Sequence, residues 1–149
     1  MQNAEIGNSS NIVFLLREVH KTREKGGVLF ELRIPFMTAK KGEFLAIVGL
    51  SGGGKSTLLD MLGLVLKPTS AKDFQLSIGT GTSEQIKIDS LQENELASIR
   101  RKSIGYVLQT GGLLPFLTVE ENIMLPGRLN QESDSSAIFD LVKRLGIAD

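Results

Sequence analysis

The stretch IVGLSGGGKSTLLDML, from Ile47 to Leu62, decides how this sequence is interpreted. Gly49 and Gly54, followed by Lys55 and Ser56, have the spacing Gly-x-x-x-x-Gly-Lys-[Ser/Thr] of a phosphate-binding loop. Such a loop curls so that successive backbone N–H groups converge on anionic oxygens with no Cβ in the way. The lysine brings a positive charge to the outer phosphates, and the serine hydroxyl is a ligand for Mg²⁺. The pattern predicts a nucleotide-phosphate site; the alternative is a glycine-rich turn that only joins a strand to a helix.

The segments on either side of the loop favour the phosphate site. The run from Phe44 to Gly49 is apolar throughout, which predicts a central parallel strand covered on both faces. The segment from Lys55 to Leu66 carries apolar residues at helical spacing, and Pro68 ends it. The N-terminus of that helix would add unpaired N–H groups and the positive end of its dipole to the loop.

The rest of the chain predicts an antiparallel β layer and further helices. Ser90 with Glu93, and Thr118 with Glu121, have the Ser/Thr-x-x-Glu spacing of a helix N-terminal capping box. In the last segment Ile138, Leu141, Val142 and Leu145 share one helical face. The predicted strands are 11–21, 28–36, 73–78, 84–88 and 103–109, with a hairpin over 73–88, and the predicted helices are 55–66, 90–102, 118–125 and 134–149.

Composition limits the function classes. The 149 residues are 41% hydrophobic and 23% charged, as expected of a soluble globular domain, and their formal net charge of zero argues against nucleic-acid partners and direct lipid binding. The absence of cysteine excludes disulfides and thiolate metal sites. The lone histidine, His20, argues against a histidine metal site or a Ser-His-Asp triad. Residues 1–11 are polar and predict a loose tail, and no apolar run approaches the ~18–20 residues needed to cross a bilayer.

Two blocks of the sequence resemble the ATP-binding subunits of ABC transporters. The first is KKGEFLAIVGLSGGGKSTLLDMLGLVLKPTS, and the second is RRKSIGYVLQTGGLLPFLTVEENIMLP, from Arg100 to Pro126. They look most similar to the branch that contains lipoprotein-releasing, macrolide-exporting and cell-division ATPases. The resemblance covers Ile12 to the end and implies an α/β fold of the P-loop NTPase class, ABC ATPase type. It implies an N-terminal antiparallel β layer with the P-loop core over 12–109 and the start of a helical subdomain over 110–149, incomplete at the C-terminus.

The resemblance also implies roles for individual residues. Gln109 becomes the catalytic Q-loop glutamine, whose carbonyl would touch Mg²⁺ or its water; alternatively it is an ordinary polar residue that ends a strand. Thr57 would contact the inner phosphate. Arg23 stands where the family usually stacks an aromatic ring on adenine; a guanidinium can stack on a base, or it can be a solvated surface group. The expected ATP ligands are Gly49, Ser51, Gly52, Gly53, Gly54, Lys55, Ser56, Thr57 and Arg23, and the expected Mg²⁺ ligands are Ser56 and Gln109.

Family members hydrolyse ATP with parts that this sequence lacks. These are the Leu-Ser-Gly-Gly-Gln signature, the Walker B strand with its aspartate and catalytic glutamate, and the switch histidine. In the family two subunits bind head to tail, so that each ATP lies between one Walker A loop and the partner's signature. Two copies of this chain would supply two cradles without lids, so we expect binding of ATP and Mg²⁺ without turnover.

Three functional hypotheses remain open from the sequence. The first is an ATPase subunit that, when complete, drives a membrane permease and resides on the cytoplasmic face of the membrane by docking to it. The second is a chain that binds nucleotide or permease without catalysis. The third, a small nucleotide kinase, predicts a lid rich in arginines and an acceptor pocket; the sequence shows neither, and only the pair Arg100 and Arg101 keeps this hypothesis open. The apolar cluster from Leu113 to Phe116 belongs either to a core or to the surface that receives the permease's coupling helix.

Overall fold

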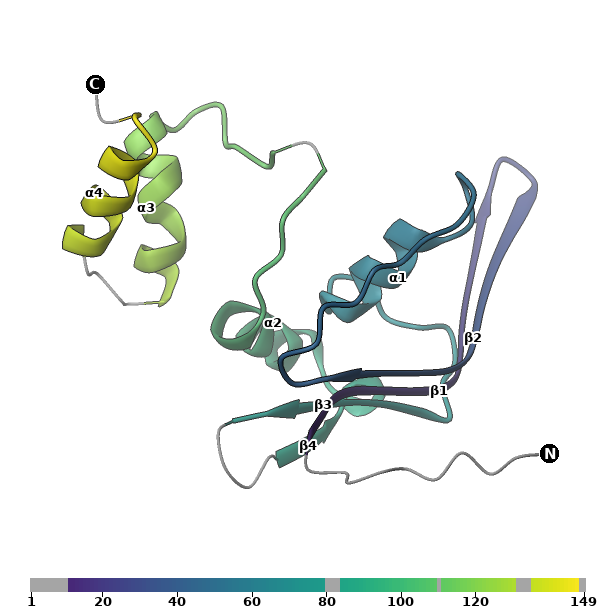
Figure 1. Cartoon of the computed structure of the whole chain (residues 1–149). Coiled ribbons are helices and arrows are strands. Elements are labelled where there is room, and N and C mark those ends of the chain that lie inside the picture. Colours follow the sequence, from purple (N-terminus) through teal and green to yellow (C-terminus); the bar gives the residue numbers. More distant parts are fainter. Residues whose placement is uncertain (1–10, 80–83, 110, 131–134, 148–149) are drawn as a thin grey trace. The chain divides into compact units, whose positions relative to one another are not determined.

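The computed structural model describes residues 11–79, 84–109, 111–130 and 135–147, and it divides into two compact units, one that ends at Ser103 and one that begins at Ile104. Each unit is described by itself (Figure 1). The second unit holds α3 (Val119–Asn130) and α4 (Ser135–Arg144). The first unit holds β1 (Ile12–Lys25), β2 (Val28–Lys40), α1 (Lys55–Leu62), β3 (Asp73–Ile78), β4 (Glu84–Lys87), the 3₁₀ turn η2 (Ile88–Ser90) and α2 (Glu93–Ser103).

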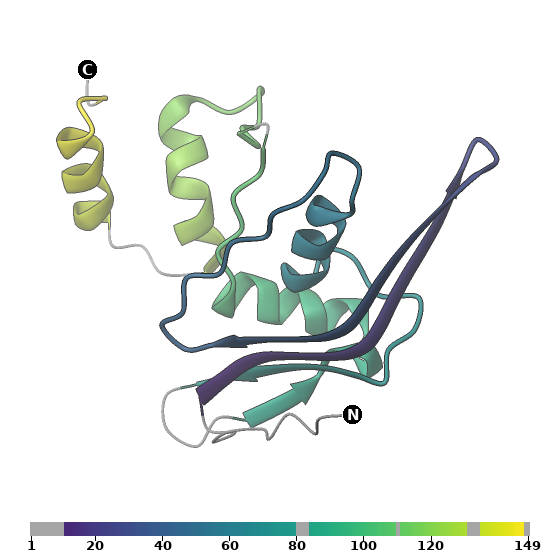
Figure 2. The ribbon, with the colours of Figure 1, turned by 45° about the vertical axis from the view of Figure 1, so that its right-hand side comes forward.

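The first unit is built on an antiparallel sheet with the strand order β2-β1-β3-β4, which confirms the predicted β layer. β1 and β2 form a long bent hairpin, and α1 lies on one side of it (Figures 1 and 2). Its two-residue turn is Gly26–Gly27, with φ of 59° and 76°, between the paired Lys25 and Val28. Two positive φ values in succession are what a type I′ turn requires, so the glycine pair fixes this register.

The core of the first unit lies between the sheet and the helices. Leu16 and Val19 of β1 and Phe74 of β3 are completely buried, and the rings of Phe14 and Phe74 lie 6.5 Å apart. Each such side chain contributes about 1.5–3 kcal/mol by leaving water. The core also includes Ile34, Met61, Leu64, Leu76, Ile88 and Leu96. Because Met61 and Leu64 belong to α1 and its C-terminal end, the core holds in place the helix that carries the glycine loop.

The predicted central strand from Phe44 to Gly49 is wrong for this structure. Residues 43–50 form no strand, and the side chains of Phe44, Val48 and Leu50 are 95%, 86% and 87% exposed. A central strand needs a partner on each side to pair its N–H and C=O groups. In the described part of the chain the sheet consists of β1 to β4 alone, so this apolar run has no strand beside it.

Two further expectations around α2 are corrected. The predicted strand 103–109 is absent: Ser103 ends α2, residues 104–108 are irregular, and Val107 is 95% exposed. The capping box of Ser90 and Glu93 is also wrong, because α2 begins later than expected. Glu95 instead accepts a 2.7 Å hydrogen bond from the Gln92 backbone N–H, three residues before it.

The second unit confirms the other capping box. The Thr118 backbone N–H donates to the Glu121 carboxylate at 2.8 Å, and the Glu121 N–H donates to the Thr118 hydroxyl at 3.2 Å. The last predicted helix forms as α4; Ile138 and Val142 face α3 across an apolar groove, whereas Leu141 and Leu145 are mostly exposed. Among the helices of the described ranges, none is both long enough and apolar enough to span a bilayer. The predicted tail lies outside the described residues except for Asn11.

Candidate phosphate-binding site

The glycine loop has the curled backbone that its sequence predicts. Gly52 and Gly54 have φ values of 78° and 88°, a region in which a side chain is strained. Between them the Gly53 N–H donates to the Leu50 carbonyl at 3.2 Å, which closes a tight turn. Gly54 is the N-cap of α1, so the loop leads directly into the helix.

The N-terminus of α1 is free to receive an anion. No side chain caps this helix, and its first intrahelical hydrogen bond runs from the Leu58 N–H to the Gly54 carbonyl at 2.9 Å. The N–H groups of Lys55, Ser56 and Thr57 therefore precede the helical hydrogen-bond ladder. Together with the positive end of the helix dipole they suit phosphate oxygens, and the residues present fit a nucleotide's phosphates.

Lys55 lies over its own loop. Its ammonium donates hydrogen bonds to the carbonyl oxygens of Gly49, at 2.9 Å, and Leu50, at 2.7 Å. These neutral carbonyls are weaker partners for an ammonium than a phosphate would be. The positive charge of Lys55 therefore lies beside the loop, where a bound phosphate can replace the two carbonyls as its hydrogen-bond acceptor.

A magnesium ion fits this site only together with a nucleotide. Ser56 is exposed in the first turn of α1, and its hydroxyl offers one oxygen ligand beside Lys55. Within the described residues no group of three or more histidine, aspartate or glutamate side chains could hold a metal. Mg²⁺ prefers six oxygen ligands and keeps several waters, so phosphate oxygens and water would have to complete its coordination here.

Strand β2 packs directly on the loop, a contact that no pattern in the sequence predicts. A Cβ built on Gly54 would lie 3.0 Å from Leu32 Cδ1 and 3.1 Å from Phe30 Cζ, so only a glycine allows β2 to approach this closely. The apolar–polar alternation from Phe30 onward places these two side chains on one face of the strand. That alternation was the available signal, but it does not say which element covers the face.

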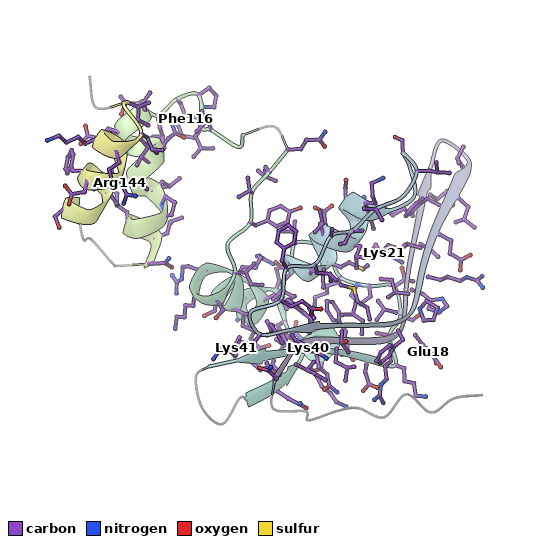
Figure 3. All side chains as sticks on the ribbon, viewed as in Figure 1. Glu18, Lys21, Lys40, Lys41, Phe116 and Arg144 are labelled. Carbon is purple, nitrogen blue, oxygen red and sulfur yellow. The ribbon has the colours of Figure 1, made fainter. Side chains whose placement is uncertain are left out.

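The hairpin is tied to the segment that follows α1. The Lys21 ammonium donates to the Lys67 carbonyl at 2.8 Å, and Thr69 Oγ1 accepts a hydrogen bond from the Thr22 N–H at 3.0 Å. Figure 3 shows Lys21 on the α1 side of the hairpin and Glu18 on the other. Burial, and then the charge of Arg23, lower the pKa of Lys21 below its ordinary value. The glycine loop before α1 and the segment after it are therefore both held against the hairpin.

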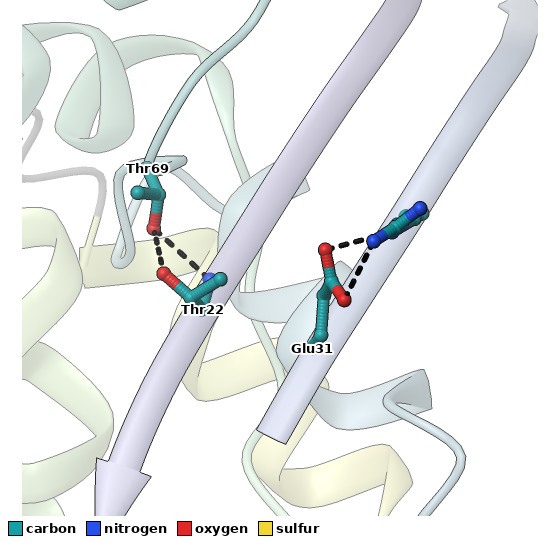
Figure 4. Close-up of polar contacts among 4 residues, drawn as sticks. Thr22, Glu31 and Thr69 are labelled. Atoms are coloured by element: carbon teal, nitrogen blue, oxygen red, sulfur yellow. Dashed lines mark hydrogen bonds and ion pairs between the residues drawn. The ribbon is translucent and has the colours of Figure 1, made fainter. Parts of the chain in front are cut away.

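The outer face of the hairpin carries a bidentate ion pair. Arg33 donates to both carboxylate oxygens of Glu31, at 2.7 and 2.9 Å (Figure 4, which also draws the Thr22–Thr69 contact). The hydrogen bond from Arg33 lowers the pKa of Glu31, and the hydrogen bond to Glu31 raises the pKa of Arg33. This pair points away from the site and reinforces the strand next to Phe30.

Of the other expected site residues, three lie in the first unit and one lies in the second. Arg23 is exposed on β1 and lies directly opposite Phe30 in the register of the hairpin, so it belongs to the element that packs on the loop. Ser51 is exposed in the loop, and Thr57 is half-buried in α1. Gln109 belongs to the second unit, where it is exposed on an irregular segment.

The second unit presents the apolar cluster on an ordered loop. The Asn122 side chain accepts the Leu114 N–H at 2.8 Å and donates to the carbonyls of Leu114 and Thr118 at 3.1 and 2.9 Å. Leu113 and Phe116 are 75% and 78% exposed, and Figure 3 shows Phe116 on this loop. Beside it, α3 and α4 enclose an apolar groove of about 300 Å³. Within the second unit these side chains are thus mostly exposed.

Comparisons with known proteins agree with the loop. The sequence model described as "ABC transporter" matches residues 33–149. An uncharacterised ABC transporter ATP-binding protein of Bacillus subtilis, YvrO, is 39% identical over 116 residues, which cover 76% of this chain and 47% of the relative. The lipoprotein-releasing system ATP-binding protein LolD of Aquifex aeolicus is 38% identical over 117 residues, covering 76% of this chain and 48% of the relative. The chain thus spans about half the length of the curated relatives it matches.

A solved structure shares the fold. It is the dimeric post-hydrolysis state of the ATP-binding cassette MJ0796, bound to ADP and Pi, and a curated sequence of that name comes from Methanocaldococcus jannaschii. The TM-score is 0.66 at 37% sequence identity, and the match covers 81% of this chain and 48% of that chain. The fold class expected from the sequence, a P-loop NTPase of the ABC ATPase type with an antiparallel β layer, is confirmed.

Proposed function

Because the chain belongs to the ABC transporter family, we propose that it is the ATP-binding part of a subunit that energises transport by a membrane permease. The observation that carries the proposal is the glycine loop. It leads into an uncapped helix N-terminus, with the Lys55 ammonium held over it by two backbone carbonyls. This arrangement is suited to bind the phosphates of a nucleoside triphosphate.

Each residue of the loop has a proposed task. The backbone N–H groups from Gly52 to Thr57 bind phosphate oxygens, and Lys55 neutralises the outer phosphates. Ser56 supplies one oxygen ligand to Mg²⁺, which when bound offsets the negative charge of the phosphates. Gln109 is proposed to complete the metal site and to contribute to catalysis. The dimeric cassette of known structure was bound to ADP and Pi, which supports nucleotide as the ligand of this chain.

We propose that turnover needs a second subunit and parts beyond this sequence. Hydrolysis requires a group that orients and activates water against the outer phosphate. No apolar run in the sequence ends in Asp-Glu, and its only histidine, His20, precedes the loop. The proposed assembly is a head-to-tail pair of ATP-binding subunits on the cytoplasmic face of a membrane. The permease would dock at the exposed cluster of Leu113 and Phe116.

Titration with a fluorescent ATP analogue and Mg²⁺ tests the proposal, with Lys55→Ala as the loop variant and a phosphate-release assay on the same samples. We expect binding by the wild-type chain, at least tenfold weaker binding by the variant, and no phosphate release by either, since a lost charged hydrogen bond costs roughly 1.5–3 kcal/mol. Lys67→Ala, a lysine outside the loop, is the matched control. Binding unaffected by Lys55→Ala would contradict the phosphate site, and Lys55-dependent release would show a complete enzyme.

A further inference from the structure

Strand β1 changes at Glu18 which of its faces is buried. Side chains of a strand alternate between its two faces, so residues three apart belong to opposite faces. Leu16 and Val19 depart from this rule, because both are completely buried. Between them Glu18 has a φ of 46°, in the left-handed region, and it lies where the hairpin bends (Figure 3). The backbone of Glu18 therefore turns the strand over.

The neighbours of β1 also change at this bend. Up to Arg17, β1 pairs with β3, and beyond it His20 forms a bridge with Ser70, in the segment after α1. On β2 the residue opposite Glu18 is Pro35, which has no N–H to donate to the ladder. The hairpin thus has a proximal half that belongs to the sheet and a distal half that leaves it.

The distal half is the part of the hairpin that covers the phosphate loop. Phe30 and Leu32 pack on Gly54, and the Thr22 N–H donates to Thr69 Oγ1 at 3.0 Å. Gly54 is the N-cap of α1, and its N–H belongs to the proposed phosphate cradle. Because the proximal half is fixed in the sheet, the angle of the bend decides whether the distal half reaches this donor.

Glutamate is an unfavourable residue for such a bend. A left-handed backbone is strained for a residue with a Cβ, and glycine and asparagine tolerate it best. The side chain does not explain the conformation, since the Glu18 carboxylate lies 4.0 Å from the Lys72 ammonium and both side chains are mostly exposed. The contacts on either side of the bend therefore hold Glu18 in a backbone conformation that it would not adopt alone.

We propose that Glu18, with Pro35 opposite to it, is a positioning residue of the phosphate site. Its left-handed backbone bends the hairpin onto the glycine loop and so holds the Gly54 N–H in place for a phosphate oxygen. This rests on the proposed function. A residue that keeps the left-handed backbone preserves phosphate binding, and one that favours an extended backbone lifts the distal half from the loop.

Substitutions of Glu18 that differ in their tolerance of positive φ test this inference. Inorganic tripolyphosphate with Mg²⁺ is titrated by calorimetry into the wild-type chain, Glu18→Asn, Glu18→Ala and Glu18→Val, all three of which remove the carboxylate. Glu18→Val should weaken binding roughly 5- to 30-fold, the factor that one left-handed backbone penalty represents. Glu18→Ala should lie between, and Glu18→Asn should bind at least as well as the wild type. Glu24→Val, at an exposed residue of the same strand, is the matched control and should leave the affinity unchanged.

Hydrogen exchange of the Thr22 amide reports the position of the distal half directly. This N–H is bonded to Thr69, so it should exchange faster in Glu18→Val than in Glu18→Asn. Equal affinities of these two variants would overturn the inference, because the backbone conformation at Glu18 would then not matter. A lower melting temperature of Glu18→Val with unchanged affinity and unchanged Thr22 exchange would also overturn it, since Glu18 would then serve the fold alone.

The outcomes also separate this inference from the proposed function. If Glu18→Val does not fold, the comparison of Glu18→Asn with Glu18→Ala decides by the same criteria. If the wild-type chain does not bind tripolyphosphate, the proposed function fails and the inference fails with it. Wild-type binding together with equal affinities of the variants overturns the inference and leaves the phosphate site intact.

Discussion

Two apolar parts of the first unit differ completely in burial, although both are rich in apolar residues. β1 and β3 bury Leu16 and Phe74 completely, whereas the run from Phe44 to Leu50 is irregular and leaves its largest side chain 95% exposed. The difference lies in where the partners come from. β1 meets β2 across a two-residue turn, and it pairs with β3 within the same unit. A central parallel strand needs neighbours that arrive through long crossover connections. An apolar sequence favours burial, but the segment is buried only where neighbouring strands are present to pair with it.

Truncating one phenylalanine from each part should give the largest contrast. Phe74→Ala removes a fully buried ring and should lower the free energy of unfolding by about 3–5 kcal/mol, the usual cost of such a cavity. Phe44→Ala removes an exposed ring and should change it by less than about 0.5 kcal/mol. Urea unfolding of the purified chain, followed by circular dichroism, measures both values. An equal loss of unfolding free energy in Phe44→Ala and Phe74→Ala would show that the 44–50 run is packed in solution. The proposed difference in burial between the two parts would then be wrong.

The same distinction explains how far the sequence could predict the structure. The Gly26–Gly27 hairpin, the β3–β4 hairpin, the glycine loop and the box of Thr118 and Glu121 are each set by residues close together in the chain, and all of them form. The box of Ser90 and Glu93 is an equally local pattern that does not form, because α2 begins only at Glu93 and Glu95 takes the capping role. The strands predicted over 44–49 and 103–109 depend on distant partners, and neither forms. The contact of Phe30 with Gly54 is also remote. Alternation predicted the face of the strand, but only the packed structure identifies the loop as its neighbour.

The glycine loop follows the exposed run 44–50 and packs on β2 at Gly54. Its glycines therefore allow a packed and an unpacked position to be compared within one loop. Gly52 and Gly54 both have positive φ, so alanine at either position should cost about 1–2 kcal/mol in backbone strain. A Cβ on Gly52 would meet open space, whereas one on Gly54 would press on Leu32 and Phe30. Gly54→Ala should therefore destabilise the unliganded chain more than Gly52→Ala, by about 1 kcal/mol further. Thermal unfolding of the two variants side by side measures this. Equal losses would mean that β2 does not pack on the loop.

The smallest effect is expected at the N-terminus of α3, where the structure depends on neighbours in sequence alone. The Thr118 backbone N–H, and then its hydroxyl, lower the pKa of Glu121 below its usual 4.5. A lowered pKa in the folded state means that this carboxylate contributes stability above about pH 4.5, which is lost as the pH falls through the folded value.

Thr118→Ala removes the hydroxyl partner, so the pKa of Glu121 should rise toward 4.5, and α3 should lose about 0.5–1 kcal/mol of stability. Leu113→Ala, at an exposed residue outside the box, is the control. An NMR titration of the Glu121 carboxyl in the three proteins measures the shift. The same pKa in Thr118→Ala as in the wild type would show that the box does not form in solution, and that even this locally encoded contact depends on partners elsewhere.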